Sequence, residues 1–74
     1  MPFLPRPQWK GNPSNELWQE WANSVSANLN QMNHRPSTAD ELDDFMDNLP
    51  RRWGIGQQSI VYTHNWLHDY LDIQ

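Results

Sequence analysis

The sequence predicts an all-α protein: a small three-helix domain preceded by an extended, proline-rich N-terminal arm. Four prolines fall within the first 13 of the 74 residues. Three later segments carry apolar side chains at the spacing of an α-helix, and residues typical of helix starts or ends separate them. We therefore predict an arm at 1–13 and a single helical domain at 14–74, with helices at about 14–34, 38–49 and 57–72.

The arm is predicted to be extended because each proline fixes its own backbone and biases the preceding residue away from helical conformations. Its apolar residues are Phe3, Leu4 and Trp9. On a free tail these side chains would stay in water, whereas a stiff segment loses little entropy when it docks. We therefore expect Phe3, Leu4 and Trp9 to anchor the arm against a partner protein.

The first helix is predicted at 14–34, with Asn12 or Ser14 as its cap and Pro13 in its first turn. Arg35-Pro36 ends it. Apolar side chains within an arc of about 140° predict a buried face. They are Leu17, Trp18, Trp21, Ala22, Val25, Leu29 and Met32. The opposite face is polar with few charges, unlike an ordinary exposed helix, and we interpret it as a second contact surface.

The second helix is predicted at 38–49. Thr38-Ala39-Asp40-Glu41 matches the capping box, in which both side chains bond to backbone N–H groups at the helix start, and Pro50 ends the helix. Ala39, Leu42, Phe45, Met46 and Leu49 form its apolar stripe. The remaining surface is an acidic face made by Asp40, Asp43, Asp44 and Asp47, with Glu41 beside them.

The third helix is predicted at 57–72, after a connector with two glycines at 51–56. Ile60, Leu67 and Leu71 are expected at the centre of its apolar face. That face is about half the circumference, which is more than one neighbouring helix can cover. Its flanks are Tyr62, Trp66, Tyr70 and Ile73. A short strand at 59–63 is the alternative, because the segment Ile-Val-Tyr-Thr favours β structure.

Few residues suggest a metal or an enzyme. His64, His68 and Asp72 follow at intervals of four, the spacing at which two histidines on one helix face bind zinc. A fourth ligand and the glutamate of the metalloprotease motif are missing, so we prefer a solvated polar edge. Ser59, His64 and Asp69 could be combined into a triad, but no nucleophile elbow or phosphate-binding loop accompanies them. We expect no enzyme activity, no cofactor and no small-molecule substrate.

The charge pattern points to protein partners. The net charge is −4, with +2 in residues 1–13 and −5 in residues 38–50, and five basic residues against nine acids argue against nucleic acid. No apolar run is long enough for a membrane helix, and the first residues do not resemble a secretory signal. We therefore expect a cytoplasmic or virion protein without a membrane partner.

Five tryptophans in 74 residues are more than a small core hides easily, and the chain has no cysteine for disulfides. The sequence thus predicts a structural or assembly protein that binds other proteins in a larger complex, such as a phage or virus particle. The predicted partner-binding residues are Phe3, Leu4, Trp9, Trp53, Trp66 and Tyr70. The alternative is a small acidic inhibitor, antitoxin-like or directed at a host enzyme, whose helix 38–49 blocks a basic site.

Overall fold

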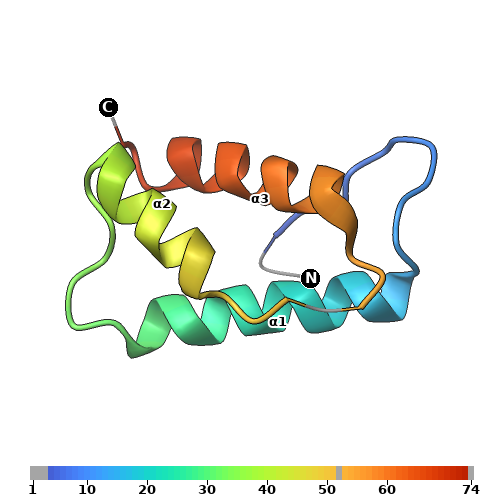
Figure 1. Cartoon of the computed structure of the whole chain (residues 1–74), viewed down its shortest axis with the longest axis horizontal. Helices are drawn as coiled ribbons and strands as arrows, with labels where there is room; N and C mark the ends of the chain where they lie inside the picture. The colour runs from blue at the N-terminus through green and yellow to red at the C-terminus, as the bar shows by residue number, and fades with distance from the viewer. Residues whose placement is uncertain (1–3, 52, 74) are drawn as a thin grey trace.

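The computed structural model describes residues 4–51 and 53–73, and these form three α-helices (Figure 1). They are α1 (Asn15–Gln31), α2 (Ala39–Asn48) and α3 (Gly56–Tyr70). In Figure 1, α1 and α3 lie along opposite sides of the molecule and run in the same direction, while α2 crosses obliquely at one end. The all-α prediction is confirmed, and the strand alternative at 59–63 is wrong because this segment lies inside α3.

Side-chain caps fix where the first two helices begin. The Ser14 hydroxyl oxygen accepts the Leu17 N–H at 3.2 Å, so Ser14 caps α1. In α2, the Glu41 N–H donates to the Thr38 hydroxyl oxygen at 3.2 Å. The carboxylate of Glu41 accepts the Thr38 hydroxyl at 3.3 Å rather than a backbone N–H, so only half of the expected capping box forms.

The ends of α1 and α3 differ from the predicted ends. The first helix stops at Gln31 rather than at 34, because Met32 has extended backbone angles. The third stops at Tyr70 rather than at 72, because Asp72 adopts a φ of 54°. The Asp72 N–H then bonds to the Asp69 carbonyl at 3.2 Å and the Ile73 N–H to the His68 carbonyl at 3.0 Å. This is a Schellman motif, which satisfies the last carbonyls of the helix.

The predicted face of α1 forms the middle of the core. Its buried side chains are Trp18, Trp21, Ala22, Val25 and Leu29, whereas Leu17 is only partly buried and Met32 is 37% exposed. From α2 come Leu42, Phe45 and Met46. These burials confirm most of the predicted apolar faces of both helices.

The buried face of α3 matches the predicted one only in part, since Leu67 is fully buried as expected but Ser59 and Thr63 were not predicted to be. Its fully buried positions are Ser59, Thr63 and Leu67, while Ile60 and Leu71 are only partly buried. The Trp21 indole N–H donates to the Thr63 hydroxyl at 2.9 Å, and that hydroxyl donates to the Ser59 carbonyl at 2.8 Å. The Thr63 hydroxyl thus pairs the one polar group of the buried Trp21 ring.

The arm folds back onto its own domain. Leu4 is 0% exposed, and its carbonyl accepts the Trp18 indole N–H at 3.2 Å. Trp9 is half-buried and packs edge-on against Tyr62, with 5.2 Å between ring centroids. Arg6 donates to the Pro13 carbonyl at 2.8 Å, which closes the arm into a loop.

This packing corrects the prediction made for the arm. Leu4 cannot anchor a partner because it is already buried in the chain's own core. Trp9 is half-covered by its contact with Tyr62, and Phe3 lies outside the described residues.

Within the described residues, we find no helix with the length and apolar character needed to cross a bilayer.

Candidate functional site

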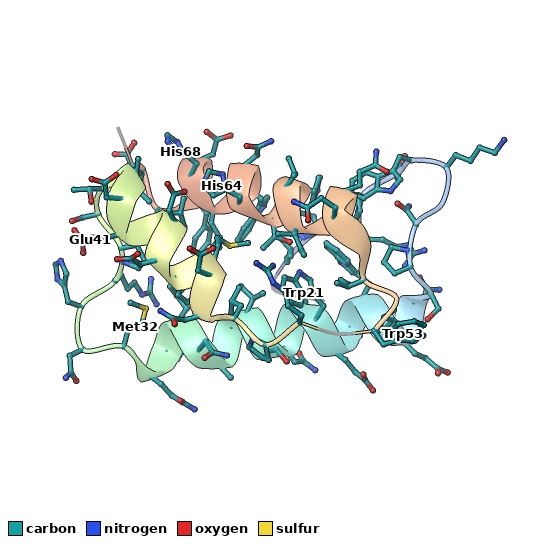
Figure 2. The ribbon with its side chains drawn as sticks, in the orientation of Figure 1. Trp21, Met32, Glu41, Trp53, His64 and His68 are labelled. Carbon is teal, nitrogen blue, oxygen red and sulfur yellow. The ribbon has the colours of Figure 1, made fainter. Side chains whose placement is uncertain are left out.

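Trp53 is the most exposed large apolar side chain among the described residues. Its relative exposure is 98%, so almost the entire indole faces solvent. It lies in the connector between α2 and α3, at the end of the molecule where α1 begins (Figure 2). The structure therefore leaves this predicted partner-binding residue available for contact.

The backbone that carries Trp53 is held in place on both sides. Leu49 and Ile55 are buried in the core, one before and one after the tryptophan. Gly54 has a φ of 87°, and a β-carbon there would lie 3.2 Å from the Leu17 Cδ2 atom of α1. The connector is thus packed against α1, and Trp53 extends outward from an anchored segment.

Trp66 and Tyr70 make a second aromatic site on α3. Their rings are stacked, with centroids 4.5 Å apart and an interplanar angle of 19°. Trp66 is partly buried against the core, while Tyr70 is 48% exposed. Of these two predicted contact residues, Tyr70 therefore has the larger share of its surface open to a partner.

The acidic face of α2 is exposed as predicted. Asp40, Asp43, Asp44 and Asp47 all lie on the surface. Among the described residues, no lysine or arginine forms an ion pair with them. The interaction that does form is between Asp43 Oδ1 and His64 Nε2, 3.0 Å apart, and it joins α2 to α3.

The three candidate metal ligands do not form a metal site. Their predicted alignment required a helix through residue 72, and α3 ends at Tyr70, so Asp72 does not share a helix face with the two histidines. The ring centroids of His64 and His68 are 6.3 Å apart, and His64 Nε2 contacts Asp43 Oδ1. In the part of the chain that the structure describes, no three histidine, cysteine or acidic residues are grouped so that they could hold an ion.

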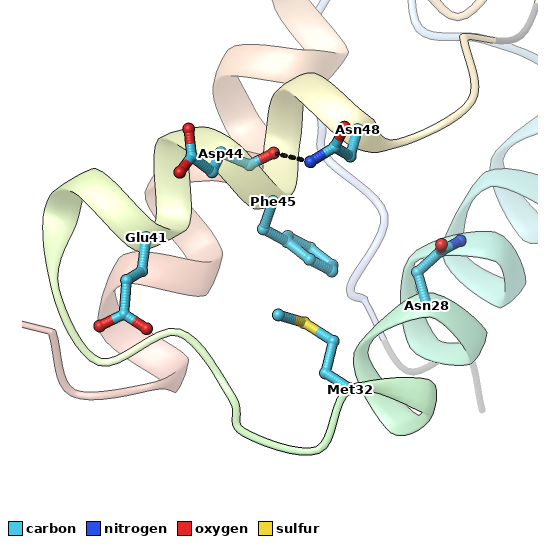
Figure 3. A pocket seen from close by; sticks show the side chains of 6 residues that line it. All are labelled: Asn28, Met32, Glu41, Asp44, Phe45 and Asn48. Atoms are coloured by element: carbon cyan, nitrogen blue, oxygen red, sulfur yellow. Dashed lines mark hydrogen bonds between the residues drawn. The ribbon is translucent and has the colours of Figure 1, made fainter.

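A pocket of about 330 Å³ lies between the C-terminal end of α1 and the side of α2 that faces it (Figure 3). Phe45 and Met32 face one another across it. We call it the α1–α2 pocket; its lining residues are Asn28, Met32, Glu41, Asp44, Phe45 and Asn48. This site was not predicted from the sequence, because Met32 and Phe45 belong to the apolar faces of two separate helices.

Comparison with models of protein families, with curated proteins and with solved structures gave no match to this chain. Three features of the protein surface therefore point to its function. That surface presents an indole in solvent, an acidic helix face without basic partners in the described residues, and a pocket with apolar and acidic lining.

Proposed function

We propose that this chain is a non-enzymatic component of a larger assembly and binds another protein through Trp53. The exposure of Trp53 is the observation that carries this proposal. Tryptophan is enriched among the residues that dominate binding energy, because it buries a large area at low entropic cost. An indole held in water on an anchored connector is well suited to insertion into a partner's pocket.

The anchors of this proposal differ from those predicted from sequence. The arm contributes to the core, so Leu4 is removed from the binding surface and Trp9 is half-covered. Trp53 replaces them as the main contact, and Tyr70 is an additional one. Phage and virus particles are assemblies of this kind, and that part of the proposal rests on composition alone.

The test is partner capture from the source organism with a tag placed after α3, whose C-terminal end lies away from Trp53 in Figure 2. We expect Trp53→Ala to reduce recovery of the specific partner at least about tenfold, as loss of a central tryptophan does at many interfaces. Val61→Ala removes another exposed apolar side chain and is the matched control. Equal recovery by the Trp53 variant and the intact chain would contradict the proposal.

An acidic inhibitor is the second candidate, and it is favoured by the acidic face of α2, with which no described lysine or arginine forms an ion pair. Binding to a basic site through this face should weaken as salt rises, because ions screen exposed charges. Replacing Asp40, Asp44 and Asp47 by lysine should abolish such binding, whereas Trp53→Ala should spare it. Partner recovery measured at two salt concentrations with both variants separates the two functions.

A further inference from the structure

We infer that the α1–α2 pocket binds an arginine side chain of the partner protein. This inference rests on the proposed function, because it names a second contact in the same protein complex. Three properties of the pocket carry it: the hydrogen-bonding groups left open at its edge, the apolar side chains beneath them, and the sign of the local charge.

The two amide side chains of the pocket each present an oxygen that can accept a hydrogen bond. The Asn28 amide nitrogen donates to the Ser24 carbonyl at 2.8 Å. The Asn48 amide nitrogen donates in the same way to the Asp44 carbonyl at 2.9 Å (Figure 3). Each nitrogen therefore uses one of its two N–H groups one turn back along its own helix. No donor among the described residues reaches either amide oxygen, so each can accept a hydrogen bond from outside.

The two carboxylates add further acceptors. No hydrogen bond or ion pair reaches the Asp44 carboxylate from the described residues. One oxygen of Glu41 accepts the hydroxyls of Ser37 and Thr38, while the other lies 3.8 Å from His34 Nε2, too far for a hydrogen bond. A ligand that donates several hydrogen bonds therefore fits this edge.

The apolar part of the pocket favours arginine among cationic ligands. Met32 is exposed on 37% of its surface and faces the Phe45 ring. The methylene stem of arginine can lie on these side chains while its charged end stays in water. Its planar guanidinium carries five donors, pairs with carboxylates through two bonds and is less strongly hydrated than an ammonium group.

Charge and volume agree with this ligand. The protein has a net charge of −4, and no described lysine or arginine forms an ion pair with either pocket carboxylate. A cationic partner is therefore attracted to this side of the molecule. The volume of about 330 Å³ accommodates one long side chain and leaves room for water.

The probe is a blocked seven-residue peptide with one arginine between two runs of three alanines, titrated into isotopically labelled protein and followed by NMR. We expect saturable shifts at the amides of α2 and the end of α1, with a dissociation constant on the order of 1 mM because a single side chain supplies the contact. Matching peptides with lysine or with uncharged citrulline should bind at least about threefold more weakly.

A pair of variants distinguishes binding in the α1–α2 pocket from general attraction to the acidic face. Asp44→Asn should weaken the arginine peptide about threefold, as expected for one solvent-exposed charge pair. Asp47→Asn removes the same charge from the same helix but does not line the pocket, and it should bind like the unmodified protein. Thermal unfolding of both variants verifies that α2 remains folded.

Equal weakening by the two variants would show general attraction to the acidic face and would overturn the inference. Equal binding of the lysine or citrulline peptide would do the same. Failure of this titration is distinguishable from failure of the proposed function, because partner capture through Trp53 is measured separately. A captured partner with no arginine-peptide binding rejects the pocket alone.

Discussion

The N-terminal arm and the connector between α2 and α3 are both irregular segments that carry a tryptophan, yet they use it in opposite ways. In the arm, Leu4 is buried in the core and Trp9 packs against Tyr62. The connector is anchored by Leu49 and Ile55, and its Trp53 remains 98% exposed. Both segments are held by buried neighbours, so the difference is that Tyr62 covers part of Trp9 whereas almost all of Trp53 faces solvent.

The largest effect is expected from Leu4→Ala. Removing a fully buried leucine costs about 2–5 kcal/mol, which in a domain of this size lowers the melting temperature by roughly 10 °C or more. Thermal and urea unfolding followed by circular dichroism measure this loss. Gln8→Ala, at an exposed position of the same arm, is the control and should change stability by less than about 0.5 kcal/mol. A Leu4 variant as stable as this control would show that the arm is not part of the core.

A smaller loss is expected from Gly54→Ala, which tests whether the connector is held as firmly as the arm. The positive φ already costs about 1 kcal/mol for alanine, and contact with Leu17 adds to it. We expect about 1–2 kcal/mol in chemical unfolding. Gly11→Ala is the matched control, because its φ is 88° and no atom lies within 4 Å of the added carbon. If both variants lose the same stability, the contact with α1 contributes nothing.

Arg6→Ala should have a still smaller effect on the arm. The hydrogen bond from Arg6 to the Pro13 carbonyl is partly buried, and its loss costs about 0.5–1.5 kcal/mol. Urea unfolding measures the change, and Arg6→Lys should recover at most part of it because lysine lacks the planar fork. An Arg6→Ala variant that is unchanged in stability would mean that prolines alone shape the arm.

The smallest effect on stability belongs to Trp53→Ala. An exposed side chain with little packing should change the free energy of unfolding by less than about 0.5 kcal/mol. The same variant is expected to lose partner binding, so the connector separates function from stability where the arm does not. A loss above about 1 kcal/mol would instead place Trp53 in the packing of the fold.

The sequence predicts α1 better than α3 for a physical reason. On α1 the buried residues are large and apolar, and their helical spacing identifies the face directly. On α3 the buried residues include Ser59 and Thr63, which a hydrophobic pattern counts as polar. Their burial depends on the Trp21 indole, which donates to Thr63 from another helix.

The candidate site was predictable only in part. The acidic face follows from residue type and spacing, and so does a possible contact role for Trp53. Whether a tryptophan faces inward or outward depends on neighbours that only the folded chain supplies, as Trp9 and Tyr62 illustrate. The α1–α2 pocket likewise exists only once two helices pack, because Met32 and Phe45 come from different elements.

The docking of the arm also sets an order of events during synthesis. Trp9 leaves the ribosome before α1, α2 and α3, yet the ring that it contacts belongs to Tyr62 of α3. The nascent chain therefore lacks this cover for Trp9 until α3 has emerged and packed. Pro5 and Pro7, on either side of Arg6, make the arm a poor β-strand. They therefore protect the arm from aggregation before α3 has packed.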